Sequence, residues 1–438
     1  MKKEKYLMIG ASTGSRELLQ DAKQTGCYTI AAGPEGTRRS IHSLGADEIW
    51  VVDTSDVDEL ERRSREAGVT AVMAGISAFN LNICIELCKR LGLPFYSSSD
   101  SRSYENSKIR FKELAKASGA PVSPDYQVSV VPTKEELRSI EYPVVVKAIN
   151  LSANRGMTFV YNEEQLIPAI ELARNLSGKE KVIVEKLLTG KEYGVHYIIA
   201  DGEPELLFVD TMLSQPGYPT SCYSLTLMES DQLASYIESV DPYVRKMIEM
   251  AGVREGICWF ELMEDKGNLF LLEMGYRLSG VLNALCAKHL YDFDEHRWLN
   301  EISRGIRHSK TDLPAKLYLN NGGKCSASYV IWSNERAGTI GEIEGVDRVS
   351  KLQGVTVEQW LKPGDVVEPY RYMMILIINA SNVDELIDTI KIINDIVRIR
   401  NTEGDNIAIF FDDYNQIRMI HEQYCDQTKQ LKQKVGML

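Results

Sequence analysis

The chain has 438 residues, too many for one hydrophobic core, and this length indicates two to four domains. Its hydrophobic fraction of 44% and charged fraction of 26% are ordinary for soluble globular proteins. A formal net charge of −12 argues against nucleic acid as the main partner, because a phosphate backbone requires a basic protein face.

No apolar run approaches the ~18 residues of a membrane span, and the first run, after Lys5, is too short for a signal-peptide core. The eight cysteines are scattered, without a CxxC pair of the kind that binds metals. We therefore expect a cytoplasmic protein with no membrane partner and with reduced thiols in its core.

Residues 1–98 alternate short apolar strands with amphipathic helices, which predicts a parallel sheet with helices on both faces. The loop Gly10–Gly14 resembles a phosphate-binding turn but lacks the full GxGxxG spacing, while Asp53 matches a ribose-binding acid. Dinucleotide binding is one interpretation. The favoured one is that the glycines only permit a tight turn, and a nicotinamide dehydrogenase is therefore disfavoured.

Residues 99–310 carry the candidate chemistry, beginning with a helix that contains Lys108. The apolar run PVVVKA ends near Lys147, where an ammonium group must reach water or an anion such as a phosphate. The small polar loop Ser152–Gly156 follows. Its backbone N–H groups can close over a triphosphate, or it is a plain hairpin loop.

A second strand, VIVEKLL, ends in a turn and supplies Glu185, Lys186 and Leu188. At such a turn, backbone groups can read an adenine edge while the lysine reaches a ring nitrogen or a phosphate. Glu192, seven residues after Glu185, can accept both ribose hydroxyls. The alternative for Glu185 and Lys186 is a surface salt bridge.

The segment WFELMEDKGNLFLLEMGYR predicts a β-hairpin with its turn at EDKGN. Its strands hold Glu261 and Glu273 among apolar residues, where an unpaired charge is costly. Two such carboxylates suit Mg²⁺, with phosphates completing the coordination shell.

Together these residues resemble the ATP-grasp superfamily of carboxylate-activating ligases over about residues 100–290. The resemblance implies phosphate binding by Lys108 and Lys147, with the loop from Ser152 to Gly156 covering the triphosphate. It also implies roles for the remaining motif residues: a hinge at Glu185, Lys186 and Leu188, ribose binding by Glu192, Mg²⁺ or Mn²⁺ binding by Glu261 and Glu273, an adenine contact at Leu272, and an acyl-phosphate contact at Arg277.

One position departs from the family pattern Glu-x-Asn-x-Arg, in which the asparagine also binds the second metal ion. Here Gly275 stands in its place, so that ligand is missing. Water can substitute for it, because Mg²⁺ commonly retains several waters.

Residues 311–438 combine strands, glycine-rich turns and one amphipathic helix, and their last dozen residues are expected to fray partly. The architecture resembles the branch that includes biotin carboxylase and L-amino-acid ligases. The implied fold is α/β and α+β: a Rossmann-like domain (1–98), an ATP-grasp domain (99–310, with a small lid subdomain at about 120–185) and a β-rich, α+β lid domain (311–438).

The implied activity is an ATP-dependent ligase that forms an acyl phosphate from a small carboxylate for attack by an amine, releasing ADP. His196 is a candidate base or a structural histidine. Substrate selection is expected in the lid and in residues 209–228, interpreted as one long polar loop beside the site, and an ordinary disordered surface loop is the alternative. The alternatives are a bicarbonate-dependent carboxylase or carbamoylating enzyme, and a non-catalytic ATP sensor. Homodimers are common in the superfamily, so a homodimer is a further expectation.

Overall fold

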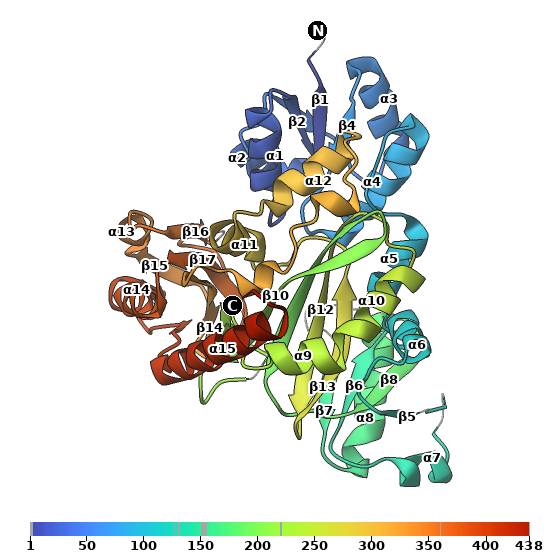
Figure 1. The fold of residues 1–438 in the computed structure, drawn as a ribbon, viewed down its shortest axis with the longest axis vertical. Coiled ribbons are helices and arrows are strands. Elements are labelled where there is room, and N and C mark those ends of the chain that lie inside the picture. The colour runs from blue at the N-terminus through green and yellow to red at the C-terminus, as the bar shows by residue number, and fades with distance from the viewer. Residues whose placement is uncertain are drawn as a thin grey trace.

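The computed structural model describes residues 3–126, 128–129, 132–149, 156–219, 221–359 and 361–437. Figure 1 shows the N-terminal segment (blue) at one end of the molecule and a small sheet (teal) at the opposite end. The C-terminal segment (orange to red) lies to one side. None of the described helices is long and apolar enough to cross a membrane.

The N-terminal strands form a parallel sheet in the order β3-β2-β1-β4, as their alternation with helices predicts. The strands are β1 (Lys5–Ile9), β2 (Tyr28–Gly33), β3 (Glu48–Val51) and β4 (Ala71–Met73). The intervening helices are α1 (Ser15–Gln24), α2 (Arg38–Ser43), α3 (Val57–Ala67) and α4 (Ala78–Leu91). This confirms the Rossmann-like N-terminal expectation. Two further helices, α5 (Ser99–Asn106) and α6 (Lys108–Ser118), lead out of the segment.

The small sheet is antiparallel, in the order β5-β8-β6-β7. It is built from β5 (Asp125–Tyr126), β6 (Val144–Ala148), β7 (Met157–Val160) and β8 (Val182–Lys186), with α7 (Lys134–Ser139) and α8 (Glu163–Ser177). Helix α8 packs on β6, β7 and β8 and buries one apolar cluster against them.

Within the described residues, the largest sheet has nine strands and runs β13-β12-β9-β10-β11-β14-β17-β16, with β19 paired to β14. Its bounds are β9 (Glu192–Ala200), β10 (Glu203–Ser214), β11 (Tyr223–Leu227), β12 (Gly256–Asp265), β13 (Asn268–Gly275), β14 (Cys325–Ser333), β16 (Val355–Gln359), β17 (Tyr372–Ala380) and β19 (Ala408–Ile409). Antiparallel pairing of β11 with β14 makes the C-terminal strands a continuation of the central ones. The three-domain division at 98 and 310 stays a prediction.

Helices cover this sheet on both sides of the β11–β14 junction. These are α9 (Leu233–Ser239), α10 (Asp241–Met250), α11 (Asn283–Tyr291), α12 (Glu295–Ser303), α13 (Val346–Val349), α14 (Val383–Ile396) and α15 (Tyr414–Lys434). Strands β15 (Ile340–Glu344) and β18 (Arg398–Asn401) pair separately. Short 3₁₀ turns lie at η1 (Glu35–Thr37), η2 (Lys310–Asp312) and η3 (Leu317–Leu319). The expected fraying of the C-terminus is wrong over most of its length, because α15 continues to Lys434 and packs on α9, α14 and η3.

Segments far apart in sequence hold the N-terminal sheet onto the rest of the molecule. Helix α12 lies against α1 (Figure 1), and Tyr6 donates a hydrogen bond to the buried Asn300. One apolar cluster runs from the N-terminal strands into β9 and β12, so the two parts share a core. The predicted combination of α/β and α+β architecture is confirmed, and its α+β part contains one large antiparallel sheet.

Candidate active site

A cavity of about 520 Å³ lies between the small sheet and the large one. Ten of the residues singled out between 108 and 277 line it, and these are Lys108, Lys147, Glu185, Lys186, Leu188, Glu192, Glu261, Leu272, Glu273 and Arg277. Gly156 is absent from the lining, and its carbonyl accepts a hydrogen bond from the backbone of Ala148. Ser152 lies outside the described residues.

The predicted hairpin is confirmed as β12 and β13, and it places two carboxylates opposite each other. Glu261 and Glu273 are direct partners in the register, and the next pair is Leu262 with Leu271. Leu272 is therefore an extra residue in β13, a β-bulge. The bulge explains how the consecutive residues Leu272 and Glu273 both line the cavity, although side chains normally alternate between faces.

Carboxylates outnumber cations at this end of the cavity. Burial, together with Glu273, Glu192 and the buried Asp210, raises the pKa of Glu261 well above its ordinary value. Burial and Glu273 likewise raise the pKa of Glu192 to about 7, although Tyr223 donates a hydrogen bond to it. The nearest lysine, Lys108, is 3.6 Å from Glu273. Such crowded carboxylate oxygens fit a divalent cation such as Mg²⁺, because each would otherwise stay protonated or repel its neighbour.

At the opposite wall, Glu185 bridges two lysines. Its two oxygens lie 2.9 Å from the Nζ atoms of Lys112 and Lys147. Burial alone would raise the pKa of Glu185, but the two ammonium groups outweigh burial and hold its pKa below the ordinary value. The surface salt-bridge alternative for Glu185 is wrong, because the side chain is 7% exposed.

Lys112 is a functional candidate that the sequence reasoning missed. Ser107 caps α6, which puts Lys108 in the first turn and Lys112 one turn later on the same face. Both line the cavity. Lys112 follows Lys108, a predicted phosphate ligand, by four residues, which is about one helical turn. This spacing is the signal in the sequence that could have identified it.

The hinge after β8 has few free backbone donors. The N–H groups of Lys186 and Leu187 donate to the carbonyls of Pro124 and Pro143. Lys186 points toward Asp265, with 3.9 Å between Nζ and Oδ2. Adenine reading by the N–H groups of Lys186 and Leu187 is therefore disfavoured, which leaves side-chain and later backbone groups for that role.

Gly275 has a physical explanation in its strand partner, Trp259. A Cβ atom at position 275 would lie 2.1 Å from the Cε2 atom of that indole, so no side chain fits there. Trp259 Nε1 is buried without a hydrogen-bond partner, and the indole lines the cavity. The Arg277 guanidinium lies 4.9 Å from the ring centroid, and its Nε donates to Glu105 at 2.6 Å. The indole thus fills the space of the missing asparagine.

His196 sits in a fully buried polar group at the back of the cavity. Its Nε2 lies 3.0 Å from Asp210 Oδ2 and its ring stacks on Phe208 at 4.2 Å. Asn283 donates to the same Asp210 oxygen. Asp210 approaches closely because its neighbour is Gly194, where a Cβ atom would lie 2.6 Å from both carboxylate oxygens. These contacts hold His196 in place and leave its role as a base open.

Residues 209–228 lie mainly in β10 and β11 rather than in one long loop. Ser221 and Tyr223 line the cavity, whereas Gln215 pairs with Asp412 away from it. The C-terminal strands complete the wall with Val330, Trp332, Tyr372 and Ile375.

Residues 140–284 match the ATP-grasp domain family. The chain contains an ATP-grasp domain. The match begins just before β6 and ends at the start of α11, so it takes in the hinge, the hairpin and Arg277.

Curated relatives of this ATP-grasp protein include carboxylases. The biotin carboxylase of Pseudomonas aeruginosa is 25% identical over 297 residues, which cover 63% of this chain and 65% of that enzyme. The alpha subunit of mitochondrial methylcrotonoyl-CoA carboxylase from Dictyostelium discoideum is 27% identical over 213 residues, covering 45% of this chain but 30% of the subunit. The chain thus spans less than two thirds of either relative.

Solved structures with the same fold cover nearly the whole chain. The biotin carboxylase domain dimer of Hydrogenobacter thermophilus 2-oxoglutarate carboxylase, in complex with MgADP, ADP and bicarbonate, has a TM-score of 0.72 at 20% identity and covers 92% of this chain and 91% of its own. The L-amino acid ligase from Bacillus licheniformis has a TM-score of 0.73 at 15% identity and covers 92% and 100%. These likenesses establish the fold.

Proposed function

We propose that this ATP-grasp protein is an ADP-forming ligase that activates a small carboxylate with Mg·ATP and passes the acyl group to an amine. One observation carries the proposal: lysines, a carboxylate pair and an arginine face one cavity from both of its walls. That arrangement suits phosphoryl transfer, in which positioning and electrostatic stabilisation supply most of the rate enhancement.

Different residues along the cavity have different chemical roles. Lys108 and Lys147 contact phosphate oxygens, with Glu185 and Lys112 holding Lys147 in position. Glu261 and Glu273 hold Mg²⁺, which when bound offsets the negative charge that develops on the transferred phosphoryl group. Leu188 and Leu272 contact the adenine, Glu192 the ribose, and Arg277 the acyl phosphate.

The reaction follows from these placements. A carboxylate oxygen of the acid attacks the γ-phosphorus, and the bond to the bridging oxygen of ADP breaks. The amine nitrogen then attacks the carbonyl carbon, and the oxyanion that forms is stabilised by Arg277. The C–O bond to phosphate breaks next, and the amine loses one proton. His196 lines the cavity and is a candidate to accept that proton, and no side-chain nucleophile is required.

Carboxylation is the second candidate, and the relatives motivate it. Biotin carboxylases are among the curated relatives, and one structure with this fold holds MgADP and bicarbonate. In that case bicarbonate would take the place of the small acid in the same cavity. The aromatic wall at Tyr223 and Trp332 favours an acid larger than bicarbonate.

An ADP-release assay separates these candidates. The full-length protein is incubated with Mg·ATP and pools of amino acids and small carboxylates, each pool with and without bicarbonate. We expect release only where one acid and one amine are both present. Release that requires bicarbonate alone would move the assignment to carboxylation, whereas tight ATP binding without turnover in any pool would move it to a sensor.

The assignment of residues has its own test. We expect Glu273→Ala and Lys147→Ala to abolish ADP release while the circular dichroism spectrum stays that of the wild type. Lys266→Ala, an exposed change in the turn of the same hairpin, is the matched control and is expected to retain activity. Normal turnover by either active-site variant would remove these site assignments.

A further inference from the structure

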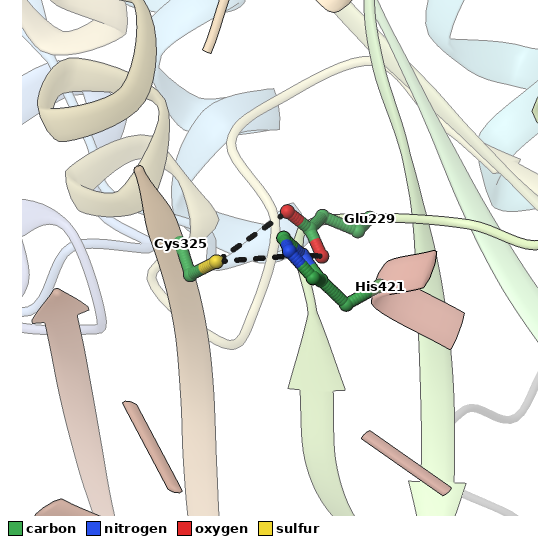
Figure 2. Close-up of side chains that lie close together, drawn as sticks. All are labelled: Glu229, Cys325 and His421. Atoms are coloured by element: carbon green, nitrogen blue, oxygen red, sulfur yellow. Dashed lines mark hydrogen bonds and ion pairs between the residues drawn. The ribbon is translucent and has the colours of Figure 1, made fainter. Parts of the chain in front are cut away.

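Away from the cavity, three side chains from distant segments converge (Figure 2). Glu229 follows β11, Cys325 begins β14 and His421 lies on α15. Cys325 is 96 residues from each of the other two in sequence. None of the three lines the active-site cavity.

The three ligand-type atoms surround a common point. Cys325 Sγ lies 3.6 Å from Glu229 Oε1 and 3.7 Å from His421 Nδ1, and His421 Nδ1 lies 2.9 Å from Glu229 Oε2. In a tetrahedral zinc site, bonds of about 2.0–2.3 Å put neighbouring ligand atoms roughly 3.3–3.6 Å apart. Both sulfur distances fit this spacing. The shorter nitrogen–oxygen distance is that of a hydrogen bond, which a cation would replace.

Without an ion, the buried carboxylate of Glu229 pairs with the His421 imidazole, whose pKa the hydrogen bonds with Cys325, Cys425 and Glu229 raise to about 12. Glu229 and Cys325 are both fully buried, and the His421 side chain is 19% exposed. Asn321 donates to Glu229 Oε1 at 3.4 Å, which helps to orient the carboxylate. A thiolate, a carboxylate and a neutral imidazole carry two negative charges, which one divalent cation neutralises. The exposed side of His421 gives the ion a path to the site.

Cys425 lies on the other side of the imidazole. Its Sγ is 3.6 Å from His421 Nε2, whereas the convergent group uses Nδ1. Because the two ring nitrogens point in different directions, Cys425 cannot bind the ion that Nδ1 binds. Water therefore occupies the fourth coordination position of the proposed site. Cys425 provides a matched control thiol for the experiment.

We propose that Glu229, Cys325 and His421 bind a divalent cation of the zinc type and that this ion ties helix α15 to the central sheet. The ion replaces the thiol proton of Cys325 and the Nδ1 proton that His421 shares with Glu229, and both protons go to solvent. Sulfur and nitrogen ligands select against Mg²⁺, so this site is separate from the carboxylate pair of the cavity. The proposal does not depend on the proposed ligase activity.

The test uses the full-length protein, stripped of metal with a chelator and kept in excess Mg²⁺. Titration with Co²⁺ is expected to give a thiolate-to-cobalt absorption band that saturates at one equivalent per chain, and Zn²⁺ is expected to displace it. Cys325→Ser is expected to lose the band, and His421→Gln to lose or strongly weaken it. Cys425→Ser and Glu273→Gln are expected to keep it.

Two further measurements distinguish a variant that does not fold from a variant that folds but does not bind the ion. Circular dichroism checks each variant, and Glu229→Gln, which keeps the shape of the side chain, replaces any variant that fails to fold. Zn²⁺ is expected to raise the Tm of the wild type and of Cys425→Ser, but not of Cys325→Ser. A wild type that shows no band, or a band that survives in Cys325→Ser, would overturn the proposal and leave the cluster as a buried ion pair beside a thiol.

Discussion

At the residue scale, the pair formed by Trp259 and Gly275 distinguishes this site from the family pattern. The two residues face each other across the hairpin, and the indole occupies the space that a side chain at 275 would need. The asparagine ligand of the family pattern is therefore absent at the position where the bulky, partly polar indole of Trp259 forms the cavity wall. Any change at one position depends on the other.

We expect Gly275→Asn to destabilise the wild type by about 1–3 kcal/mol, because the new side chain overlaps the indole. In a Trp259→Ala background the same change should cost much less, since the cavity left by the indole accepts the asparagine. Urea unfolding of the four proteins measures this coupling. An equal cost in both backgrounds would show that the indole does not exclude the side chain.

The carboxylate Glu192 makes stability depend on pH. Burial and Glu273 raise its pKa to about 7 from the ordinary 4.5. Between these two values the unfolded chain releases the proton while the folded protein retains it, so the free energy of unfolding falls as pH rises through this window and then levels off.

Glu192→Gln removes that dependence, because the amide does not titrate and still accepts the hydrogen bond from Tyr223. Without Mg²⁺ and nucleotide, we expect the variant to be more stable than the wild type at pH 8, by on the order of 1–3 kcal/mol, and the gain to shrink toward pH 4.5. Denaturant unfolding across this pH range measures the difference. A difference that stays constant with pH would contradict the assignment.

At the element scale, one buried ion network joins three elements that border the cavity. Glu185 on β8 holds Lys147 on β6 and Lys112 on α6. The small sheet is therefore tied to the helix that carries Lys108. The carboxylate also keeps the ammonium of Lys147 at the wall of the cavity, where a phosphate can reach it.

We expect Glu185→Gln to cost about 3 kcal/mol, the lower end for breaking a buried ion pair, because Lys147 loses its carboxylate partner while Lys112 retains Asp125 at 3.7 Å and the carbonyl of Ser123. Lys186→Gln, at the next residue, whose side chain is 34% exposed and lies 3.9 Å from Asp265, is the comparison and should cost under 1 kcal/mol. Thermal and urea unfolding compare the two. A small effect of Glu185→Gln would mean that water solvates both lysines.

At the scale of the whole molecule, the cavity takes its walls from segments spread between Ile76 and Ile375. The small sheet supplies Lys147, the hairpin supplies the carboxylates, and the C-terminal strands supply Trp332 and Tyr372. Because Tyr372 lies on β17, four strands across the large sheet from β9 and its ribose candidate Glu192, we assign it to the acid or amine rather than to ATP.

Tyr372→Ala is accordingly expected to raise KM for the acid or amine about 10-fold or more and to change KM for ATP less than twofold. Steady-state ADP release at varied concentrations of each substrate separates the two effects. Tyr161→Ala, an exposed aromatic change in the small-sheet segment outside the cavity lining, is the control. A change confined to KM for ATP would reverse the assignment.

Local patterns along the chain determined much of this protein. Alternating strands and helices predicted the N-terminal sheet, and apolar runs around a polar turn predicted the hairpin, because these features depend on neighbours within a few residues. The order of lysines and acids predicted an ATP site, and these lysines and acids line one cavity, whereas Gly156 does not.

Tertiary structure alone decided what depends on contacts between distant segments. The indole of Trp259 at Gly275, the bridge from Glu185 to Lys112, and the continuation of the central sheet through β14 each join residues that no local period relates. The cluster of Glu229, Cys325 and His421 spans 192 residues and leaves no signature in sequence spacing. Strand pairing across a sheet and the packing of a terminal helix depend on burial and register between distant segments. Only the folded chain specifies these contacts.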